Sequence, residues 1–253
     1  MRMGALARAG LVLGALLAAG SALAQEAPPL PHQQWSFSGP FGTFDRAALQ
    51  RGFLVYQQVC SACHSMKELY YRNLEGIGLS ADDVKAIAAS AQIPDLDDRG
   101  QPTTRPGLPS DHFKSPFPND LAARAANNGA LPPDQSVLAL AREGGPDYLY
   151  AVLTGYAGPP PTMHMQPGMY YDTYFPGHQI AMPQPLRDGS VTYTDGAKPT
   201  LQQEAHDVVT FLAWAAQPEM ETRKATGVRV VLYLLLLAGL TYAVKRQVWS
   251  DVH

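Results

Sequence analysis

Apolar and polar residues alternate at helical spacing in several short segments of the chain, and proline-rich stretches separate these segments. The clearest segment is residues 45–63, where Leu49, Phe53 and Tyr56 share one helical face. Asp45 stands at its start, where a helix cap is expected. The same periodicity predicts further helical segments at residues 65–74, 80–91, 119–128, 135–142, 147–155 and 201–216.

Three other stretches lack this periodicity. Residues 93–118 contain six prolines and residues 158–185 contain seven, so both are predicted to be long loops. Residues 25–44 are rich in proline, glycine and aromatic side chains, and we expect them to form an extended arm lying over the domain. The pattern therefore predicts a mainly α fold with long proline-rich loops.

Both ends of the chain are strongly apolar. At the N-terminus, Arg2 and Arg8 precede an apolar run at residues 9–20, and small residues at 22–24 form a cleavage site. Residues 1–24 are therefore predicted to be a cleaved signal peptide. A retained anchor is the alternative, but the apolar run is too short to span a bilayer.

The C-terminal apolar run, residues 227–244, has eighteen residues and one charge near its start, which is enough to span a membrane. We expect the anchor to cover residues 223–246 and to leave residues 247–253 as a short cytoplasmic tail. The flanking basic residues slightly favour the opposite orientation. The signal peptide decides against that orientation, because it exports residues 25–222.

The charge of the chain is modest and gives no sign of a nucleic-acid partner. The net charge is −3, and it becomes 17 − 22 = −5 once Arg2 and Arg8 are removed with the signal peptide. Between residues 75 and 100, six acidic residues outnumber two basic ones. The acidic residues are Glu75, Asp82, Asp83, Asp95, Asp97 and Asp98. They form either an ordinary solvated face or an acidic surface that attracts a basic partner.

Cys60, Cys63 and His64 form the pattern Cys-x-x-Cys-His, the attachment motif of c-type haem. Spacings of three and four residues put these side chains on one helical face, so that two thiols reach one porphyrin and the imidazole reaches its iron. A redox dithiol and half of a zinc site are the alternatives. A zinc site needs further ligands, and the chain has no other cysteine. We therefore predict one covalent haem c with His64 as its proximal ligand.

A second axial ligand is expected from the loop at residues 158–185. The candidates in this loop are Met163, Met165, Met169, Met182, His164 and His178. Any of the methionines is equally suited to fill a core. The residues alone leave this choice open.

Several segments together resemble the cytochrome c1 family, whose members are the haem-bearing subunits of bc1 complexes, in its bacterial form. The matching segments are Arg51-Gly52-Phe53, Cys60 to Met66, Arg124 to Asp134, Leu153 to Tyr156, Tyr174 to Gly177 and the C-terminal helix with its anchor. The resemblance implies a class I cytochrome c-like haem domain with one C-terminal transmembrane helix.

The same resemblance implies the remaining site residues. It makes Met182 the distal axial ligand, and it places Asn127, Pro133 and Tyr148 around the haem edge. Arg142 is implied as the partner of a haem propionate, because a guanidinium binds a carboxylate through two hydrogen bonds. Arg124 is a second candidate for that role.

The function implied is that of an electron carrier that makes or breaks no substrate bond. As a subunit of ubiquinol–cytochrome c reductase, it would take one electron from a Rieske iron–sulfur protein and pass it to a soluble c-type cytochrome. It would lie beside cytochrome b in a dimeric complex of the bacterial inner membrane, with its haem domain on the periplasmic side. One alternative is a five-coordinate c-type haem enzyme or sensor. The other is a membrane-tethered cytochrome that acts as a stand-alone shuttle.

Overall fold

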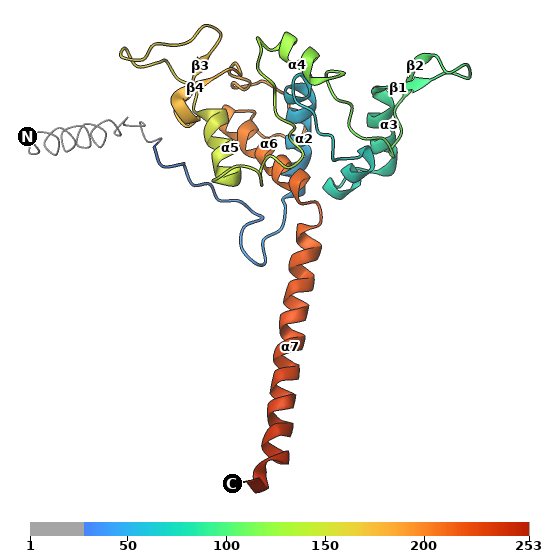
Figure 1. Ribbon diagram of the computed structural model, residues 1–253, viewed down its shortest axis with the longest axis vertical. Helices are drawn as coiled ribbons and strands as arrows, with labels where there is room; N and C mark the ends of the chain where they lie inside the picture. Colours follow the sequence, from blue (N-terminus) through green and yellow to red (C-terminus); the bar gives the residue numbers. More distant parts are fainter. Residues whose placement is uncertain (1–27, 253) are drawn as a thin grey trace, which may run out of the picture.

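The computed structural model describes residues 28–252, so the predicted signal peptide lies outside the described residues. The other helices form a head, and one long helix, α7 (Met220–Val248), extends away from the head as a single helix (Figure 1). The helices of the head are α2 (Arg46–Gln58), α3 (Ala81–Ser90), α4 (Asp120–Ala126), α5 (Gly145–Thr154) and α6 (Leu201–Ala216), with the short 3-10 helices η1 (Cys60–Ala62), η2 (Tyr71–Ile77) and η3 (Pro176–His178). Two antiparallel strand pairs accompany them: β1 (Gln92–Leu96) with β2 (Pro102–Pro106), and β3 (Tyr170–Tyr171) with β4 (Gln179–Ile180). The prediction of a mainly α fold is confirmed.

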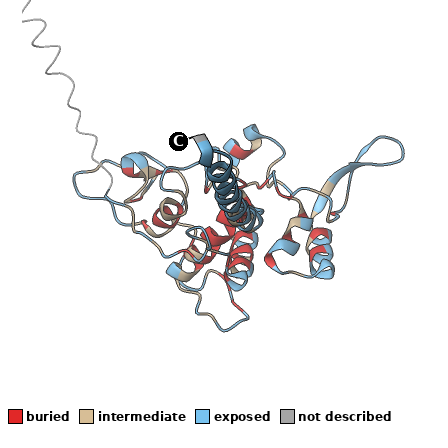
Figure 2. Cartoon of the chain, turned by 90° about the horizontal axis from the view of Figure 1, so that it is seen from below, coloured by how far each residue is buried: buried red, intermediate tan, exposed pale blue. Residues whose placement is uncertain are grey.

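Helices α2 and α6 cross at the centre of the head, where burial is deepest (Figure 2). Gly52 permits the close crossing, because a Cβ at this position would clash with the carbonyl oxygen of Asp207 and lie 2.8 Å from Cβ of Phe211. The surrounding core is apolar and comes from both helices: Leu49, Phe53, Val55, Tyr56, Val208, Val209, Phe211, Leu212 and Trp214. The predicted face of α2 is therefore the face that it buries.

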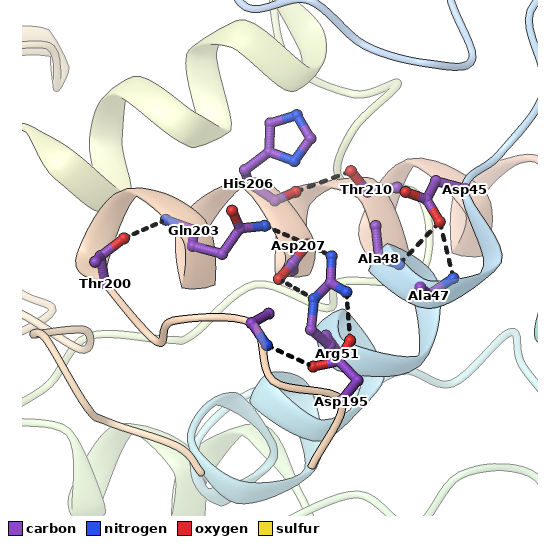
Figure 3. Close-up of polar contacts among 11 residues, drawn as sticks. Asp45, Ala47, Ala48, Arg51, Asp195, Thr200, Gln203, His206, Asp207 and Thr210 are labelled. Atoms are coloured by element: carbon purple, nitrogen blue, oxygen red, sulfur yellow. Dashed lines mark hydrogen bonds and ion pairs between the residues drawn. The ribbon is translucent and has the colours of Figure 1, made fainter. Parts of the chain in front are cut away.

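Helix α6 has the bounds that its pattern predicts, but it is enclosed on more than its apolar side. Glu204 and Asp207 are both fully buried. Arg51 of α2 donates from Nε to Oδ2 of Asp207 at 2.8 Å and from Nη1 to Oδ2 of Asp195 at 2.6 Å (Figure 3). The hydrogen bond with Asp207 raises the pKa of Arg51 despite the opposing effect of burial. A charged network therefore ties α2 to α6 at the edge of the apolar core, with Asp207 fully buried and Asp195 exposed.

The prediction of a loop at residues 93–118 was wrong for residues 93–106, where β1 and β2 form a hairpin, whereas residues 107–118 form no helix or strand. The hairpin projects away from the head beyond α3 (Figure 1). Asp97 organises its turn, since Oδ1 accepts from the backbone N–H groups of Arg99 and Gln101, both at 2.8 Å. The prolines are tolerated because a two-stranded sheet leaves alternate N–H groups without a ladder partner.

The prediction of a helix at residues 135–142 was also wrong, because this segment forms only a series of turns. The backbone N–H of Gln135 donates to the carbonyl oxygen of Ser65 at 2.8 Å. The hydroxyl of Ser136 accepts from the backbone N–H of Glu68 at 3.0 Å. These bonds tie the start of the segment to residues far away in the sequence, while its remaining local bonds, such as that from the N–H of Ala141 to the carbonyl oxygen of Val137 at 3.0 Å, form turns.

The helix predicted over residues 45–63 ends five residues early, at Gln58, and η1 follows it. Asp45 caps α2 as predicted, since Oδ1 accepts from the N–H groups of Ala47 and Ala48 at 2.9 and 3.3 Å. Residues 65–74 are helical only from Tyr71 onward, in η2. The chain leaves the helical path at residue 65 because this segment bonds to residues 134–136.

Residues 28–44 lie against the head as the predicted extended arm. Trp35 stacks on His206 of α6, with ring centroids 4.6 Å apart. Its Nε1 donates to Oδ1 of Asp147 at 2.7 Å, at the start of α5. Phe44 ends the arm and is only 5% exposed. The arm therefore joins α5 and α6 before the chain enters α2.

Helix α7 has 29 residues, and its apolar part is long enough to cross a membrane and is not buried against the head. At a rise of 1.5 Å per residue its length is about 44 Å. It begins at Met220, earlier than the apolar run, so its first turns stand between the head and the apolar segment. This finding fits the predicted membrane anchor.

Candidate haem site

The motif Cys60 to His64 forms a compact turn directly after α2. The carbonyl oxygen of Cys60 accepts from the N–H groups of Cys63 at 3.1 Å and of His64 at 2.9 Å. The second of these bonds has the spacing of an α-helical turn, although the residues between form the 3-10 helix η1. The backbone therefore keeps one helical turn between the first thiol and the imidazole.

The two cysteines are not joined to each other. Burial raises the pKa of the Cys60 thiol to about 12, and the charge of Cys63 adds to this effect. A thiol with such a pKa is protonated at neutral pH. Within residues 28–252, no cluster of three or more His, Cys, Asp and Glu side chains is arranged to hold a metal ion.

The imidazole of His64 has a defined orientation. Its Nδ1 lies 2.8 Å from the carbonyl oxygen of Pro133. A carbonyl oxygen only accepts, so Nδ1 carries the proton and Nε2 is the basic nitrogen. Burial lowers the pKa of His64, against a smaller opposing effect of the Pro133 bond, and so favours the neutral form that a metal requires. Pro133, predicted at the haem edge, thus contacts the predicted proximal ligand.

A polar clasp holds this orientation. Oδ2 of Asp134 accepts from the hydroxyl of Ser65 at 2.7 Å and from the N–H of Lys67 at 2.9 Å, while Oδ1 accepts from the N–H of Ser136 at 2.9 Å. Burial raises the pKa of Asp134, but these hydrogen bonds outweigh it and hold the pKa below its usual value. The clasp fixes residues 65–67 against residues 133–136, and with them His64 against Pro133.

Met182 follows β4 in an irregular segment and is half-buried. The hydroxyl of Tyr156, just after α5, donates to the carbonyl oxygen of Met182 at 2.9 Å. Tyr156 also forms a backbone bridge with Asp172, a fully buried residue whose Oδ1 accepts from the N–H groups of Tyr174 and Phe175 at 2.9 and 2.8 Å. These contacts fasten the segment that carries Met182 to the end of α5.

The other candidate ligands of this loop differ in their surroundings. Met163, Met165 and Met169 are half-buried, as Met182 is, and His164 is exposed. His178 is buried, and its Nδ1 lies 3.2 Å from the carbonyl oxygen of Asp172. Burial alone therefore does not distinguish Met182 from the other methionines.

Asn127 and Arg124 are engaged at the end of α4. Nδ2 of Asn127 donates to the carbonyl oxygen of Ala123 at 2.7 Å, and Nη1 of Arg124 donates to the carbonyl oxygen of Gly129 at 3.0 Å. Gly129 has a φ of +88°, the left-handed conformation that glycine adopts readily after a helix. Both predicted residues thus stabilise the turn after α4.

Arg142 and Tyr148 lie near each other on either side of the start of α5. Arg142 is exposed, and its Nη1 donates to the carbonyl oxygen of its neighbour Ala141 at 3.2 Å. Burial raises the pKa of Tyr148, and the positive charge of Arg142 partly offsets this. The ion pairs among residues 28–252 do not involve Arg142. Its charge is therefore available to an anionic group.

The chemistry of the donor set fits a haem c. Two unpaired thiols, one helical turn apart, are followed by an imidazole whose Nε2 is the basic nitrogen. A cavity of about 400 Å³ borders the motif, because Ser61 and Ala62, which lie between the two cysteines, are in its wall. The rest of the wall includes Phe53, Tyr56, Tyr71 and Phe113 but not the cysteines or His64.

Comparison with known proteins gives a consistent result. The sequence profile described as "Cytochrome C1 family" matches residues 35–252. "Cytochrome c1" of Rhodospirillum rubrum is 46% identical over 266 residues, which is 98% of this chain and 97% of that protein. "Cytochrome c1-2, heme protein, mitochondrial" of Solanum tuberosum is 44% identical and is matched over 94% of this chain and 92% of its own length. "Cytochrome b/c1" of Bradyrhizobium diazoefficiens is 46% identical over 98% of this chain, which corresponds to 39% of that longer protein.

Proposed function

Because this chain belongs to the cytochrome c1 family, we propose that it takes single electrons from a Rieske iron–sulfur protein and passes them to a soluble c-type cytochrome. Family membership implies a haem cofactor and a place in the bc1 complex. The observation that supports the site best is the hydrogen bond between Nδ1 of His64 and the carbonyl oxygen of Pro133, because it leaves Nε2 to bind iron.

In this proposal Cys60 and Cys63 would hold a single haem through two thioether bonds to its vinyl groups. His64 binds through Nε2 and Met182 through its thioether sulfur. When bound, the haem supplies an iron that gains and loses one electron. Because the soft thioether favours ferrous iron, His/Met ligation raises the reduction potential above that of two histidines.

The surrounding residues tune and position this centre. The carbonyl oxygen of Pro133 keeps the proton on Nδ1 of His64 and makes Nε2 more basic. Arg142 pairs with a haem propionate, and neutralising that carboxylate raises the potential further. Asn127, Pro133 and Tyr148 pack at the haem edge. Arg124 is the weaker propionate partner, because it is engaged at the end of α4.

We also infer the arrangement at the membrane. Helix α7 anchors the protein in the bacterial inner membrane, with the head on the periplasmic side and residues 247–253 in the cytoplasm. The protein lies beside cytochrome b in a dimeric complex. Two observations support this inference: α7 is long and apolar enough to span a bilayer, and the name of one relative combines cytochromes b and c1.

The acceptor is proposed to dock on the acidic surface of η2, α3 and the β1–β2 hairpin. All of its acidic residues are exposed: Glu75, Asp82, Asp83, Asp95, Asp97 and Asp98. Asp95 is paired with Arg105 at 2.9 Å, whereas Asp98 appears in none of the ion pairs among the described residues. A basic cytochrome meets a surplus of negative charge here.

The ligand set is tested by absorption spectroscopy of the membrane-extracted holoprotein. We expect the oxidised wild type to show the weak near-infrared band of a sulfur–iron bond, and Met182→Leu to lose this band with a large fall in reduction potential. Met165→Leu, which removes another half-buried methionine of the same loop, should keep both properties. Retention of the band in Met182→Leu would reassign the ligand. A wild type that lacks the band and binds carbon monoxide readily would instead support a five-coordinate enzyme or sensor.

A further inference from the structure

The arm ends in a tight loop, residues 38–43, that lies beside the first turns of α7 (Figure 1). The N–H of Ser38 donates to the carbonyl oxygen of Trp35 at 3.0 Å, and the N–H of Thr43 donates to that of Ser36 at 3.1 Å. Gly39 adopts a φ of +73°, which side-chain-bearing residues rarely tolerate. The shape of this arm loop is therefore defined by its own backbone.

The arm loop is fastened to α7. Nζ of Lys224 donates to the carbonyl oxygens of Phe37 at 2.6 Å and Gly42 at 3.1 Å. Glu221 accepts from the N–H of Phe44 at 2.7 Å and from Nη2 of Arg46 at 2.5 Å. Lys224 and Glu221 lie almost one helical turn apart on α7, so they grip both ends of the loop. The loop therefore holds a fixed position relative to α7.

This position is the level at which the apolar run of α7 begins. Lys224 precedes Gly227, the first residue of the run, by three residues, which is about 4.5 Å along the helix axis. A groove of about 170 Å³ between the arm loop and α7 extends from Glu221 to Val228, a residue within the run. The arm loop is thus alongside the end of the apolar segment.

Phe41 at the tip of the arm loop is 79% exposed, although the aromatic residues on either side of the loop, Phe37 and Phe44, pack inward on each other with ring centroids 4.9 Å apart. We propose that Phe41 inserts into the interfacial layer of the lipid bilayer beside α7. The exposed surface of Phe41 is continuous with the exposed apolar surface of α7. An aromatic side chain suits the boundary between headgroups and acyl chains. Arg223, Arg229 and Lys224 bring positive charge to the same level, which favours anionic headgroups. The head then has a second membrane contact besides the anchor.

The proposal rests on α7 crossing a membrane but not on the identity of the haem ligands. The test uses the full-length holoprotein in nanodiscs of phosphatidylcholine and phosphatidylglycerol. A nitroxide is attached through Phe41→Cys, and two further single variants are controls: Leu96→Cys on the hairpin and Val231→Cys in the apolar run. All three side chains are more than half exposed, at 79%, 64% and 56%, so the substitutions leave the fold intact. The label reports its access to oxygen, which partitions into lipid, and to a water-soluble nickel chelate.

We expect the ratio of oxygen access to nickel access at position 41 to be several-fold higher than at position 96 and to approach the ratio at position 231. A ratio at position 41 equal to that at position 96 would overturn the proposal, because the loop would then face water. The same label in the purified complex, if screened from both reagents, would also overturn it, because a protein partner would then cover the loop. Low ratios at both 41 and 231 would instead contradict the anchor itself.

Discussion

The hydrogen bond from Tyr156 to the carbonyl oxygen of Met182 has a direct consequence for the proposed distal ligand. Tyr156→Phe removes a bond of 2.9 Å and leaves the ring in place. A hydrogen bond of this kind contributes about 1 kcal/mol, so detachment of Met182 from iron should become roughly fivefold easier. We expect the near-infrared band of the oxidised protein to disappear about 0.7 pH unit lower than in the wild type, as measured by an alkaline titration.

Tyr170→Phe is the control for this titration, because Tyr170 lies in β3 of the same loop region and is 45% exposed. Its titration should match that of the wild type. An unchanged midpoint in Tyr156→Phe would show that the hydroxyl does not help to hold Met182.

Glu204 predicts a pH-dependent stability. Its Oε1 accepts from the N–H of Val191 at 3.1 Å, while its buried Oε2 has no partner in the described structure. Burial raises the pKa of Glu204 above its unfolded value. The folded state is therefore not penalised below the unfolded pKa, and it loses stability as the pH rises through the folded pKa.

Glu204→Gln removes this penalty and keeps an acceptor for Val191. We expect the variant to be more stable than the wild type at pH 8, by about 1–3 kcal/mol, and equal to it below about pH 4. Thermal unfolding followed by circular dichroism at both pH values measures this difference. Glu219→Gln, at an exposed position, should change neither value. A Glu204→Gln advantage that persists in acid would contradict the linkage.

At the scale of the elements, the crossing of α2 and α6 depends on Gly52. In Gly52→Ala the new methyl group meets the backbone of α6, so the helices must separate. We expect a loss of about 1–3 kcal/mol in the free energy of unfolding, although alanine favours an isolated helix. Gly227→Ala in α7 is the matched control, since nothing lies within 4 Å of its added Cβ. Equal stabilities of the two variants, in denaturant titrations, would contradict a tight crossing.

The elements that the sequence predicts well are those whose ends are set locally. Helix α3 begins after Ser80, whose hydroxyl accepts from the N–H of Asp83 at 3.1 Å, while the Asp83 carboxylate accepts in return. Helix α6 keeps its predicted bounds because Thr200 caps it and Pro218 follows its end. The segment at 135–142 has helical periodicity too, but the backbone N–H of Gln135 bonds to Ser65 and the hydroxyl of Ser136 bonds to Glu68, and no local pattern predicts such distant partners.

The candidate site likewise has residues that the sequence predicts and contacts that it does not predict. Cys60, Cys63 and His64 are recognisable from spacing alone, because one helical turn brings them together. The contact between His64 and Pro133 and the clasp of Asp134 depend on chain segments that meet only in the folded protein. Ser65, directly after the motif, and Ser136, two residues after the Pro-Pro-Asp segment, are the polar residues that could have indicated these contacts. Their roles cannot be predicted without knowing that the two segments are neighbours in the fold.

At the scale of the whole molecule, the acidic surface lies on the projecting hairpin and α3, on the side of the head away from β3 and β4 (Figure 1). Association with a basic c-type cytochrome should slow several-fold when the ionic strength rises from about 0.01 M to about 0.15 M, because the Debye length falls from about 30 Å to about 8 Å. Stopped-flow electron transfer measures this rate.

Replacing Asp97 and Asp98 together by Asn should weaken that salt dependence, whereas Glu219→Gln near the base of the head should leave it unchanged. A salt dependence equal in all three proteins would remove this surface as the docking site. The reduction potential should be the same in each, since these side chains are outside the candidate haem site.

Among residues 28–252, Lys224 and Glu221 hold the first turns of helix α7 to the arm, and the apolar residues that follow are exposed. In a helix of about 44 Å that is held at one end, a small change of tilt displaces the other end by a large distance. A membrane thicker or thinner than its apolar length makes such a helix tilt. Because Lys224 and Glu221 hold the first turns of α7 against the arm, a tilt of α7 would be passed on to the head. In the proposed membrane arrangement, the thickness of the bilayer would thereby change the angle at which the Cys60–His64 turn faces its proposed partners.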